Sequence, residues 1–268
     1  MKVGLVGFGK TGKAVASILL ESQTTHLSWV LRRSKALEHR SVPEFLGVES
    51  EEPGMILSAG EFSARGLLDA YPVDVIVDFS SPDGIDYYGE EARRRGICII
   101  SAVSEYPAAA LDRLKQLAKG TKVIYSPNIT LGINFLLIAA KILKNISPGT
   151  DIEIIEEHYK KKPEVSGTAK IIAKHLDIEE STIKTVRAGG IIGTHEILFG
   201  FPYQTVRLKH ESISREAFGN GILFALNHLP SRKTGLYSME DLMIPYFQPG
   251  KSERDSSRSK TKPWWKVW

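Results

Sequence analysis

The sequence predicts a two-domain α/β protein. Strand-like and helix-like segments alternate from Lys2 to Tyr125, which is typical of a parallel sheet with helices on both faces. After Pro148-Gly149 the chain changes to alternating apolar and polar segments with turn residues between them, which predicts a mixed sheet. We therefore expect an N-terminal, Rossmann-like doubly wound parallel sheet and a C-terminal α+β domain.

The first element is an apolar strand, Lys2 to Val6, followed by a glycine-rich turn and a helix from Lys13 to Glu21. In this context G-x-G-x-x-G is a dinucleotide fingerprint, because its glycines allow the tight turn, the approach of phosphate and the packing of the helix. A glycine turn without a ligand is the alternative. The predicted cofactor-binding residues here are Gly7, Phe8, Gly9, Lys10, Thr11 and Gly12.

The second strand, His26 to Leu31, ends in a basic turn that contains Arg32 and Arg33. A Rossmann protein selective for NAD places an acidic residue there to bind the ribose hydroxyls, and this turn has none. Guanidinium groups bind phosphate in bidentate fashion. The turn therefore predicts NADPH, with its 2′-phosphate at Arg32 and Arg33, and NADH as a possible second cofactor; a solvated basic turn is the alternative.

The remaining elements of the first domain follow in order. Ser41 to Ala59 is polar and punctuated by Pro and Gly, which predicts a loop with one short strand at Met55 to Leu57. Further strands are expected at Pro72–Phe79, Ile97–Val103 and Lys122–Tyr125, and helices at Gly84–Arg95 and Pro107–Lys119. Ligands of such a sheet bind at the carboxyl ends of the strands.

The second domain begins with a strongly apolar helix, Ile129 to Asn145, which we expect to be a buried connector. The predicted strands that follow are Asp151–Glu156, Ile183–Arg187, His195–Phe201 and Thr205–Glu211. Their alternation indicates a sheet with one covered face.

The segment from Glu153 to Ala169 combines an acid/base group, a cation and a helix start. Its strand would deliver His158 to a solvent-facing end, and Ser166 is a candidate N-cap for the helix that follows. Unpaired N–H groups at a helix start, with Lys162 nearby, would bind a carboxylate. This is the chemistry of reducing a carboxylate-bearing substrate; a solvated loop and an ordinary helix cap are the alternative.

The same segment resembles the 4-hydroxy-tetrahydrodipicolinate reductase (dihydrodipicolinate reductase) family, whose signature is close to E-x-H-H-x-x-K-x-D-A-P-S-G-T-A. His158, Lys162 and Ser166 to Ala169 match it, whereas Tyr159 replaces the second histidine and the segment Glu164-Val165 is shortened. The resemblance implies that His158 donates a proton and Lys162 assists it. It implies substrate binding by Tyr159, Ser166, Gly167, Thr168 and Arg215.

The resemblance extends from Met1 to about Leu242 and carries further expectations. It implies the NAD(P)H-dependent reduction of 4-hydroxy-tetrahydrodipicolinate to tetrahydrodipicolinate in lysine and diaminopimelate biosynthesis, by a homotetramer. Residues 1–127 would bind the dinucleotide with 228–247 packed back onto them, and residues 128–227 would bind substrate and oligomerise. Further cofactor contacts would come from Phe79, Ser80, Ser101, Ala102, Ser104, Ser126, Pro127 and Asn128.

Composition limits the classes of ligand and the cellular compartment that fit this chain. The net charge of +4 and the lack of a basic stripe before Lys251 favour small anionic ligands over nucleic acid. Cys98 is the single cysteine, no apolar run reaches membrane-spanning length, and the first strand starts directly after Met1, so we expect a cytoplasmic protein. The histidines show no metal-ligand spacing, so no metal is expected. Residues 251–268 are expected to be disordered.

Two other functions stay open. The departures at Tyr159 and Glu164-Val165 allow a reductase of the same fold that acts on a different cyclic imine or carboxylate. The tryptophans near the C-terminus allow a non-catalytic NADP-binding sensor that docks a partner, although the pairing of His158 with Lys162 argues against it.

Overall fold

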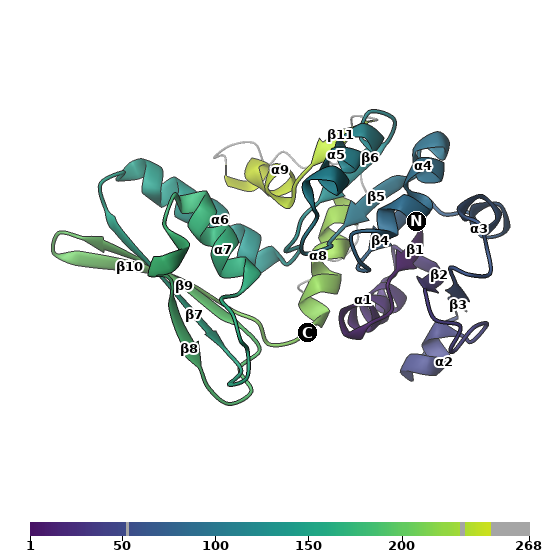
Figure 1. Ribbon diagram of the computed structural model, residues 1–268, viewed down its shortest axis with the longest axis horizontal. Coiled ribbons are helices and arrows are strands. Elements are labelled where there is room, and N and C mark those ends of the chain that lie inside the picture. Colours follow the sequence, from purple (N-terminus) through teal and green to yellow (C-terminus); the bar gives the residue numbers. More distant parts are fainter. Residues whose placement is uncertain (52–53, 231–233, 248–268) are drawn as a thin grey trace.

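The structure is a computed structural model that describes residues 1–51, 54–230 and 234–247. The predicted tail, residues 251–268, lies outside the described residues. Two sheets lie at opposite ends of the molecule (Figure 1). The architecture confirms the predicted α/β fold class.

The first sheet has seven strands in the order β11-β6-β5-β4-β1-β2-β3. Every pair of neighbours is parallel. The order reverses at β1 and β4, which puts a ligand crevice at the carboxyl ends of these two strands. The strands are β1 (Lys2–Val6), β2 (His26–Arg32), β3 (Met55–Ser58), β4 (Val75–Asp78), β5 (Cys98–Ser101), β6 (Lys122–Tyr125) and β11 (Gly235–Tyr237).

Helices cover both faces of this sheet, so each face has its own apolar core. One core joins the sheet to α1 (Lys10–Glu21), α2 (Val42–Leu46) and α8 (Glu216–Asn227). The other joins it to α3 (Ala64–Ala70), α4 (Gly84–Arg95) and α5 (Ala108–Leu117). Strands buried on both faces explain the nearly continuous apolar runs in the sequence.

The prediction of a loop from Ser41 to Ala59 with one short strand was wrong in part. The segment contains helix α2 as well as strand β3, and α3 follows it. Each of these short helices is started by a serine side chain that accepts a backbone hydrogen bond, Ser41 from Glu44 N and Ser63 from Gly66 N. Helices this short show no apolar periodicity, so polar and Pro/Gly content dominated the prediction.

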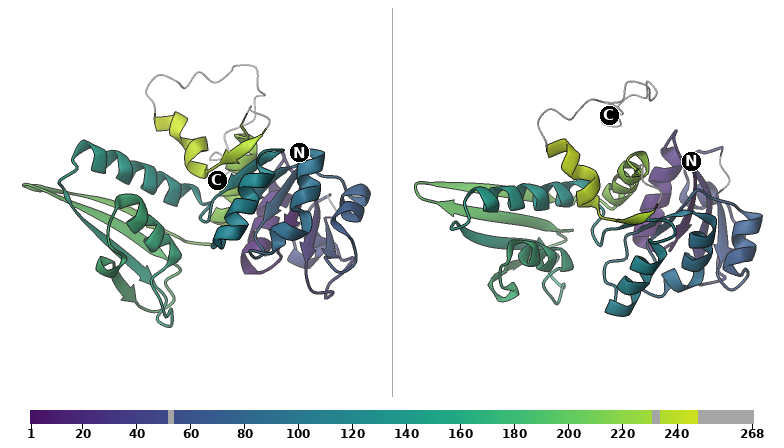
Figure 2. Two further views of the ribbon diagram at one scale, coloured as in Figure 1. Left: turned by 45° about the horizontal axis from the view of Figure 1, so that its top comes forward. Right: turned by 90° about the horizontal axis from the view of Figure 1, so that it is seen from above.

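The second sheet is mixed, as predicted. It comprises β10 (Gln204–Glu211), β9 (Thr194–Phe201), β7 (Asp151–His158) and β8 (Lys184–Arg187) in that order, of which only the β7–β8 pair is parallel. Helices α6 (Leu131–Ile146) and α7 (Gly167–Leu176) cover one face (Figure 1), and the short helix η1 (Glu180–Thr182) precedes β8. The β9–β10 hairpin projects away from the first domain in all three views (Figures 1 and 2).

Helix α6 connects the two sheets, as predicted, but it is buried on one side only. Ile133, Leu137 and Ala140 are buried, but Phe135 is 53% exposed and Ile146 is 73% exposed. The helix therefore has an inner face in the core of the second domain and an outer face that is still apolar.

The C-terminal part of the described chain returns to the first domain. Helix α8 packs against α1 so closely that a Cβ on Gly219 would lie 2.6 Å from Cβ of Ile18. Strand β11 then pairs with β6, and α9 (Met239–Met243) and η2 (Ile244–Phe247) follow. Lys141 of α6 pairs with Glu240 of α9 at 2.7 Å. Among the described residues, no helix has the length and apolar character that a membrane crossing requires.

Candidate active site

The glycine turn between β1 and α1 is shaped for close approach. Gly7 has φ of +95°, and a Cβ there would lie 2.7 Å from the backbone of Phe79. A Cβ on Gly12 would lie 2.0 Å from the carbonyl oxygen of Gly7. A Cβ on Gly9 would meet no described atom within 4 Å, and Gly9 caps α1 without any side-chain hydrogen bond. The first N–H groups of α1 are therefore open to a phosphate, and the turn fits a dinucleotide.

Arg33 directly follows β2 and lies beside an acidic residue, although the turn that contains Arg33 has no acidic residue of its own. Its Nη2 donates to Ser81 Oγ at 2.9 Å and forms an ion pair with Asp83. Hydrogen bonds from Ser81 and Arg33 lower the pKa of Asp83. The carboxylate comes from the loop between β4 and α4, which the parallel sheet places beside the end of β2.

The other predicted cofactor residues follow β4, β5 and β6, so they share one edge of the sheet with Gly7. Ser80 donates to Asp78 from its backbone N and its Oγ, and Tyr88 donates to the other carboxyl oxygen at 2.7 Å. Burial raises the pKa of Asp78, and these hydrogen bonds oppose the rise. Ser101 is fully buried, and its hydroxyl lies 2.9 Å from Tyr106 Oη. Asp78 thus fixes the loop that carries Phe79 and Ser80.

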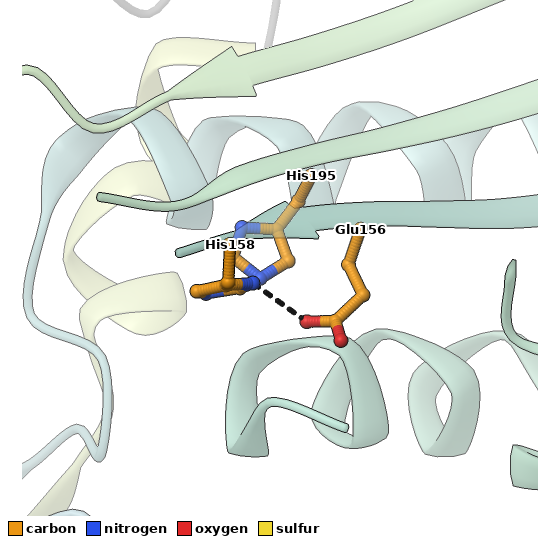
Figure 3. Close-up of side chains that lie close together, drawn as sticks. All are labelled: Glu156, His158 and His195. Atoms are coloured by element: carbon orange, nitrogen blue, oxygen red, sulfur yellow. Dashed lines mark ion pairs between the residues drawn. The ribbon is translucent and has the colours of Figure 1, made fainter. Parts of the chain in front are cut away.

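His158 ends β7, as predicted, but the prediction that it faces solvent was wrong. The side chains of a strand alternate between its faces, so Ile154, Glu156 and His158 all point to the face that α7 covers. His158 is only 7% exposed. Figure 3 shows its ring beside the side chains of Glu156 and His195.

Glu156 is the centre of this cluster and is fully buried. Its Oε1 accepts from Arg187 Nη2 at 2.6 Å, and its Oε2 accepts from Ser166 N at 3.2 Å. Oε2 also lies 3.0 Å from His158 Nδ1, an ion-pair distance without the angle of a hydrogen bond (Figure 3). Burial raises the pKa of Glu156, but the hydrogen bonds from Ser166 and Arg187 outweigh it, so the pKa is lowered. Glu156 is a buried carboxylate.

His195 of β9 completes the cluster. The rings of His158 and His195 lie 5.3 Å apart, edge to face, and His195 Nε2 is 2.9 Å from Ser166 Oγ. Burial lowers the pKa of His195 to about 4, and the neighbouring His158 adds to this. Burial also lowers the pKa of His158; Glu156 opposes the effect and Lys162 reinforces it. Both imidazoles are therefore neutral at pH 7.

The spacing of the histidines along the sequence showed no metal-ligand pattern, but the fold brings two of them together with a carboxylate. Glu156, His158 and His195 each offer one ligand atom, and these atoms lie within 4.8 Å of one another. The antiparallel pairing of β7 and β9 places His195 directly opposite Glu156. Residues opposite each other in a sheet share a face, whatever their separation along the chain.

Arg187, at the end of β8, holds the loop that carries Lys162. Its Nε donates to the carbonyl oxygen of Lys162 at 3.1 Å, and its Nη2 donates to that of Glu164 at 2.9 Å. Lys162 N donates to the carbonyl oxygen of Tyr159, whose side chain is 45% exposed. Arg187, Glu156 and His195 were not among the predicted site residues, although the alternation of β7 puts Glu156 on the face of His158.

The predicted N-cap of α7 is confirmed, and the anion cradle expected at this helix start is made of Ser166, Gly167 and Thr168. Ser166 Oγ accepts from Ala169 N at 3.1 Å and so caps α7, while a Cβ on Gly167 would meet no described atom within 4 Å. Thr168 Oγ1 accepts from Asn128 Nδ2 at 3.0 Å. A predicted cofactor residue therefore touches a predicted substrate residue, which joins the edge of the first sheet to the start of α7.

Arg215 lies beside the first domain. It lines a hollow of about 430 Å³ together with Lys10 and Lys13 of α1 and with Ile192 and Ser214. Glu216 lines the hollow as well, so the three cations leave a net positive charge, which favours an anionic ligand.

A parallel sheet with a glycine turn open to phosphate is typical of a dinucleotide-binding protein. Comparison with known families is specific. The N-terminal family of dihydrodipicolinate reductase matches residues 1–129, and its C-terminal family matches residues 128–243. The chain belongs to the dihydrodipicolinate reductase family.

Individual relatives support the same family assignment. A 4-hydroxy-tetrahydrodipicolinate reductase of Caldanaerobacter subterraneus subsp. tengcongensis is 33% identical over 192 residues, which cover 63% of this chain and 76% of the relative. That of Janthinobacterium sp. (strain Marseille) is 29% identical and covers 91% and 98%. The dipicolinate-bound dihydrodipicolinate reductase of Paenisporosarcina sp. TG-14 shares the fold, with a TM-score of 0.74, 22% identity and coverage of 90% and 98%.

These findings confirm the predicted family, fold class and nicotinamide cofactor. They also confirm the predicted function, because the family performs the reduction step of lysine and diaminopimelate biosynthesis.

Proposed function

We propose that the residues of this site carry out the family's reaction in defined roles, with His158 as the proton donor and Lys162, Ser166, Gly167 and Thr168 as the binders of a dicarboxylate substrate. The observation that carries the proposal is the hydrogen bond from Asn128 to Thr168, because it brings the cradle to the strand ends where the nucleotide binds. The nicotinamide, when bound, supplies the reducing equivalents.

The first domain would hold the nucleotide through backbone and basic side chains. The pyrophosphate would bind at the open start of α1, where Gly7, Gly9 and Gly12 leave room. Arg32 and Arg33 would bind the 2′-phosphate of NADPH. For that contact the guanidinium of Arg33 must leave the carboxylate of Asp83. An acidic residue at this place binds the ribose hydroxyls of NADH, so the same loop allows NADH as well.

His158 would be charged only when substrate is present. In the free protein its burial, Lys162 and Arg187 favour the neutral imidazole. Substrate carboxylates bound at Lys162 and the start of α7 would offset these cations. The carboxylate of Glu156, 3.0 Å from Nδ1, would then stabilise the imidazolium that donates the proton.

The same proposal includes several properties of the family. We propose that residues 1–127 with 228–247 form the nucleotide domain, that residues 128–227 form the substrate domain, and that the protein is cytoplasmic. The face of the second sheet that α6 and α7 do not cover carries exposed Arg207, Lys209 and Val186 and half-buried Ile155 and Leu198. We propose that this face forms the homotetramer.

Kinetic variants test the roles. His158→Gln should lower kcat by roughly 10²–10⁴ with little change in KM, because the proton moves only in the transition state. Lys162→Met should raise KM for the substrate as well as lower kcat, because its charge acts in both states. His175→Gln, in the same domain but outside the cluster, is the matched control. Wild-type kcat in His158→Gln would contradict the proposal.

A further inference from the structure

We propose that Glu156, His158 and His195 form a binding site for a divalent transition-metal ion, best matched by Zn²⁺, and that the bound ion switches off the reductase. The binding site itself does not depend on the roles proposed above. The inhibition does, because it requires His158 to be the proton donor.

The donor set is that of a zinc site. Two imidazole nitrogens and one carboxylate oxygen suit Zn²⁺, which is usually tetrahedral with Zn–N of about 2.0–2.1 Å. Donors around such an ion lie about 3.4 Å apart by that geometry. The three donors here lie within 4.8 Å of one another, and Glu156 and His158 are already 3.0 Å apart. Small side-chain rotations would therefore close the site.

One of the donors is free of hydrogen bonds. Nδ1 of His158, 3.0 Å from Oε2 of Glu156, is buried and has no hydrogen-bond partner among the described residues. A buried ring nitrogen without a partner is costly and marks a place for a ligand or an ion. On His195 the nitrogen that faces the cluster is Nε2, which lies 2.9 Å from Ser166 Oγ, so a bound ion would replace that contact (Figure 3).

Neighbouring groups already hold Glu156 and His158 in place. Arg187 takes Oε1 of Glu156, which leaves Oε2 facing His158 (Figure 3). A Cβ on Gly193 would lie 3.0 Å from His158 Nε2, so Nε2 packs against the chain and Nδ1 is turned toward Glu156. Outer contacts of this kind orient metal ligands and strengthen binding.

The consequence for the reaction follows from the chemistry of imidazole. A nitrogen that donates its lone pair to a metal cannot carry a proton, so a zinc-bound His158 cannot become the imidazolium. The ion would also add positive charge beside Lys162. Mg²⁺ and Ca²⁺ prefer oxygen ligands and should neither bind here nor inhibit.

Binding can be measured without any activity. The full chain, stripped with a chelator, should take up one tightly bound Zn²⁺ in equilibrium dialysis, and Co²⁺ should give the visible absorption of a tetrahedral ion. His195→Gln and Glu156→Gln should each weaken Zn²⁺ binding at least tenfold. His175→Gln is the control within the domain, and His39→Gln removes the exposed pair of His39 and Glu61, which lies at 3.0 Å.

If the cluster variants do not fold, zinc titration of the wild-type chain still tests the site. In histidine ¹⁵N spectra, one equivalent of Zn²⁺ should perturb the imidazoles of His158 and His195 first. No tight zinc binding, retention of it in both cluster variants, or its loss in His39→Gln would overturn the site. Zinc that binds at the cluster while reduction continues unchanged would overturn the inhibition and count against His158 as proton donor.

Discussion

Replacement of Glu156 by glutamine tests the link between the buried carboxylate and the proposed proton donor. Glutamine keeps the size of the side chain but removes the charge that Oε2 places 3.0 Å from His158 Nδ1. Arg187 would keep its positive charge nearby and lose its ionic partner. Both changes disfavour the imidazolium, so the pKa of His158 should fall further.

The size of the effect follows from the contact distance. An opposite charge within about 4–6 Å typically changes a pKa by about 1–3 units, and each unit is a factor of ten in the protonated fraction. At pH 8, where the donor is scarce, kcat should therefore fall by about tenfold or more. At low pH the loss should be smaller, because more of the donor is protonated.

The assay is the dependence of kcat on pH for the wild type and Glu156→Gln, with a chelator present. The decline of kcat with rising pH should begin at lower pH in the variant. Glu153→Gln, on the opposite face of β7, is the matched control and should leave the profile unchanged. Superimposable profiles for the wild type and Glu156→Gln would refute the reasoning.

Three further predictions concern other parts of the chain. Arg33→Ala should raise KM for NADPH about tenfold more than KM for NADH, because a charge-assisted phosphate contact contributes about 1.5–3 kcal/mol. Asp83→Asn should lower KM for NADPH relative to KM for NADH. Equal changes for both nucleotides would count against a role of this pair in cofactor choice. Burial lowers the pKa of His195 from 6.5 to about 4 in the folded protein. Between these pH values the unfolded chain binds a proton at His195 that the folded chain does not. The free energy of unfolding should therefore fall as pH falls through that window, by up to about 3 kcal/mol. Denaturant unfolding at pH 7.5 and 4.5 measures this loss, which should shrink in His195→Gln. Burial raises the pKa of Cys98 to about 12, so iodoacetamide should label it at pH 8 only after unfolding; rapid labelling of the native protein would show that the strand is open.

The elements and contacts that depend on local sequence were predictable. Helix α4 and strand β6 have the bounds that periodicity gave, and Ser166 caps α7 as its position before an apolar run indicated. The glycine turn was predictable because its requirements are local: Gly7 adopts a positive φ, and Gly12 lies against the carbonyl oxygen of Gly7.

The contacts that depend on register or packing were not predictable. His195 reaches Glu156 only through the pairing of β9 with β7, and Asp83 reaches Arg33 only through the order of the strands in the first sheet. The burial of His158 depends on α7 lying over that face, which no property of β7 reveals.

The most direct test of the account is a coupled assay in which dihydrodipicolinate synthase generates 4-hydroxy-tetrahydrodipicolinate and the purified chain is supplied with NADPH or NADH. The account predicts nucleotide oxidation that requires the synthase product and yields tetrahydrodipicolinate. No oxidation with either nucleotide, or oxidation that is equally fast without the synthase product, would contradict it.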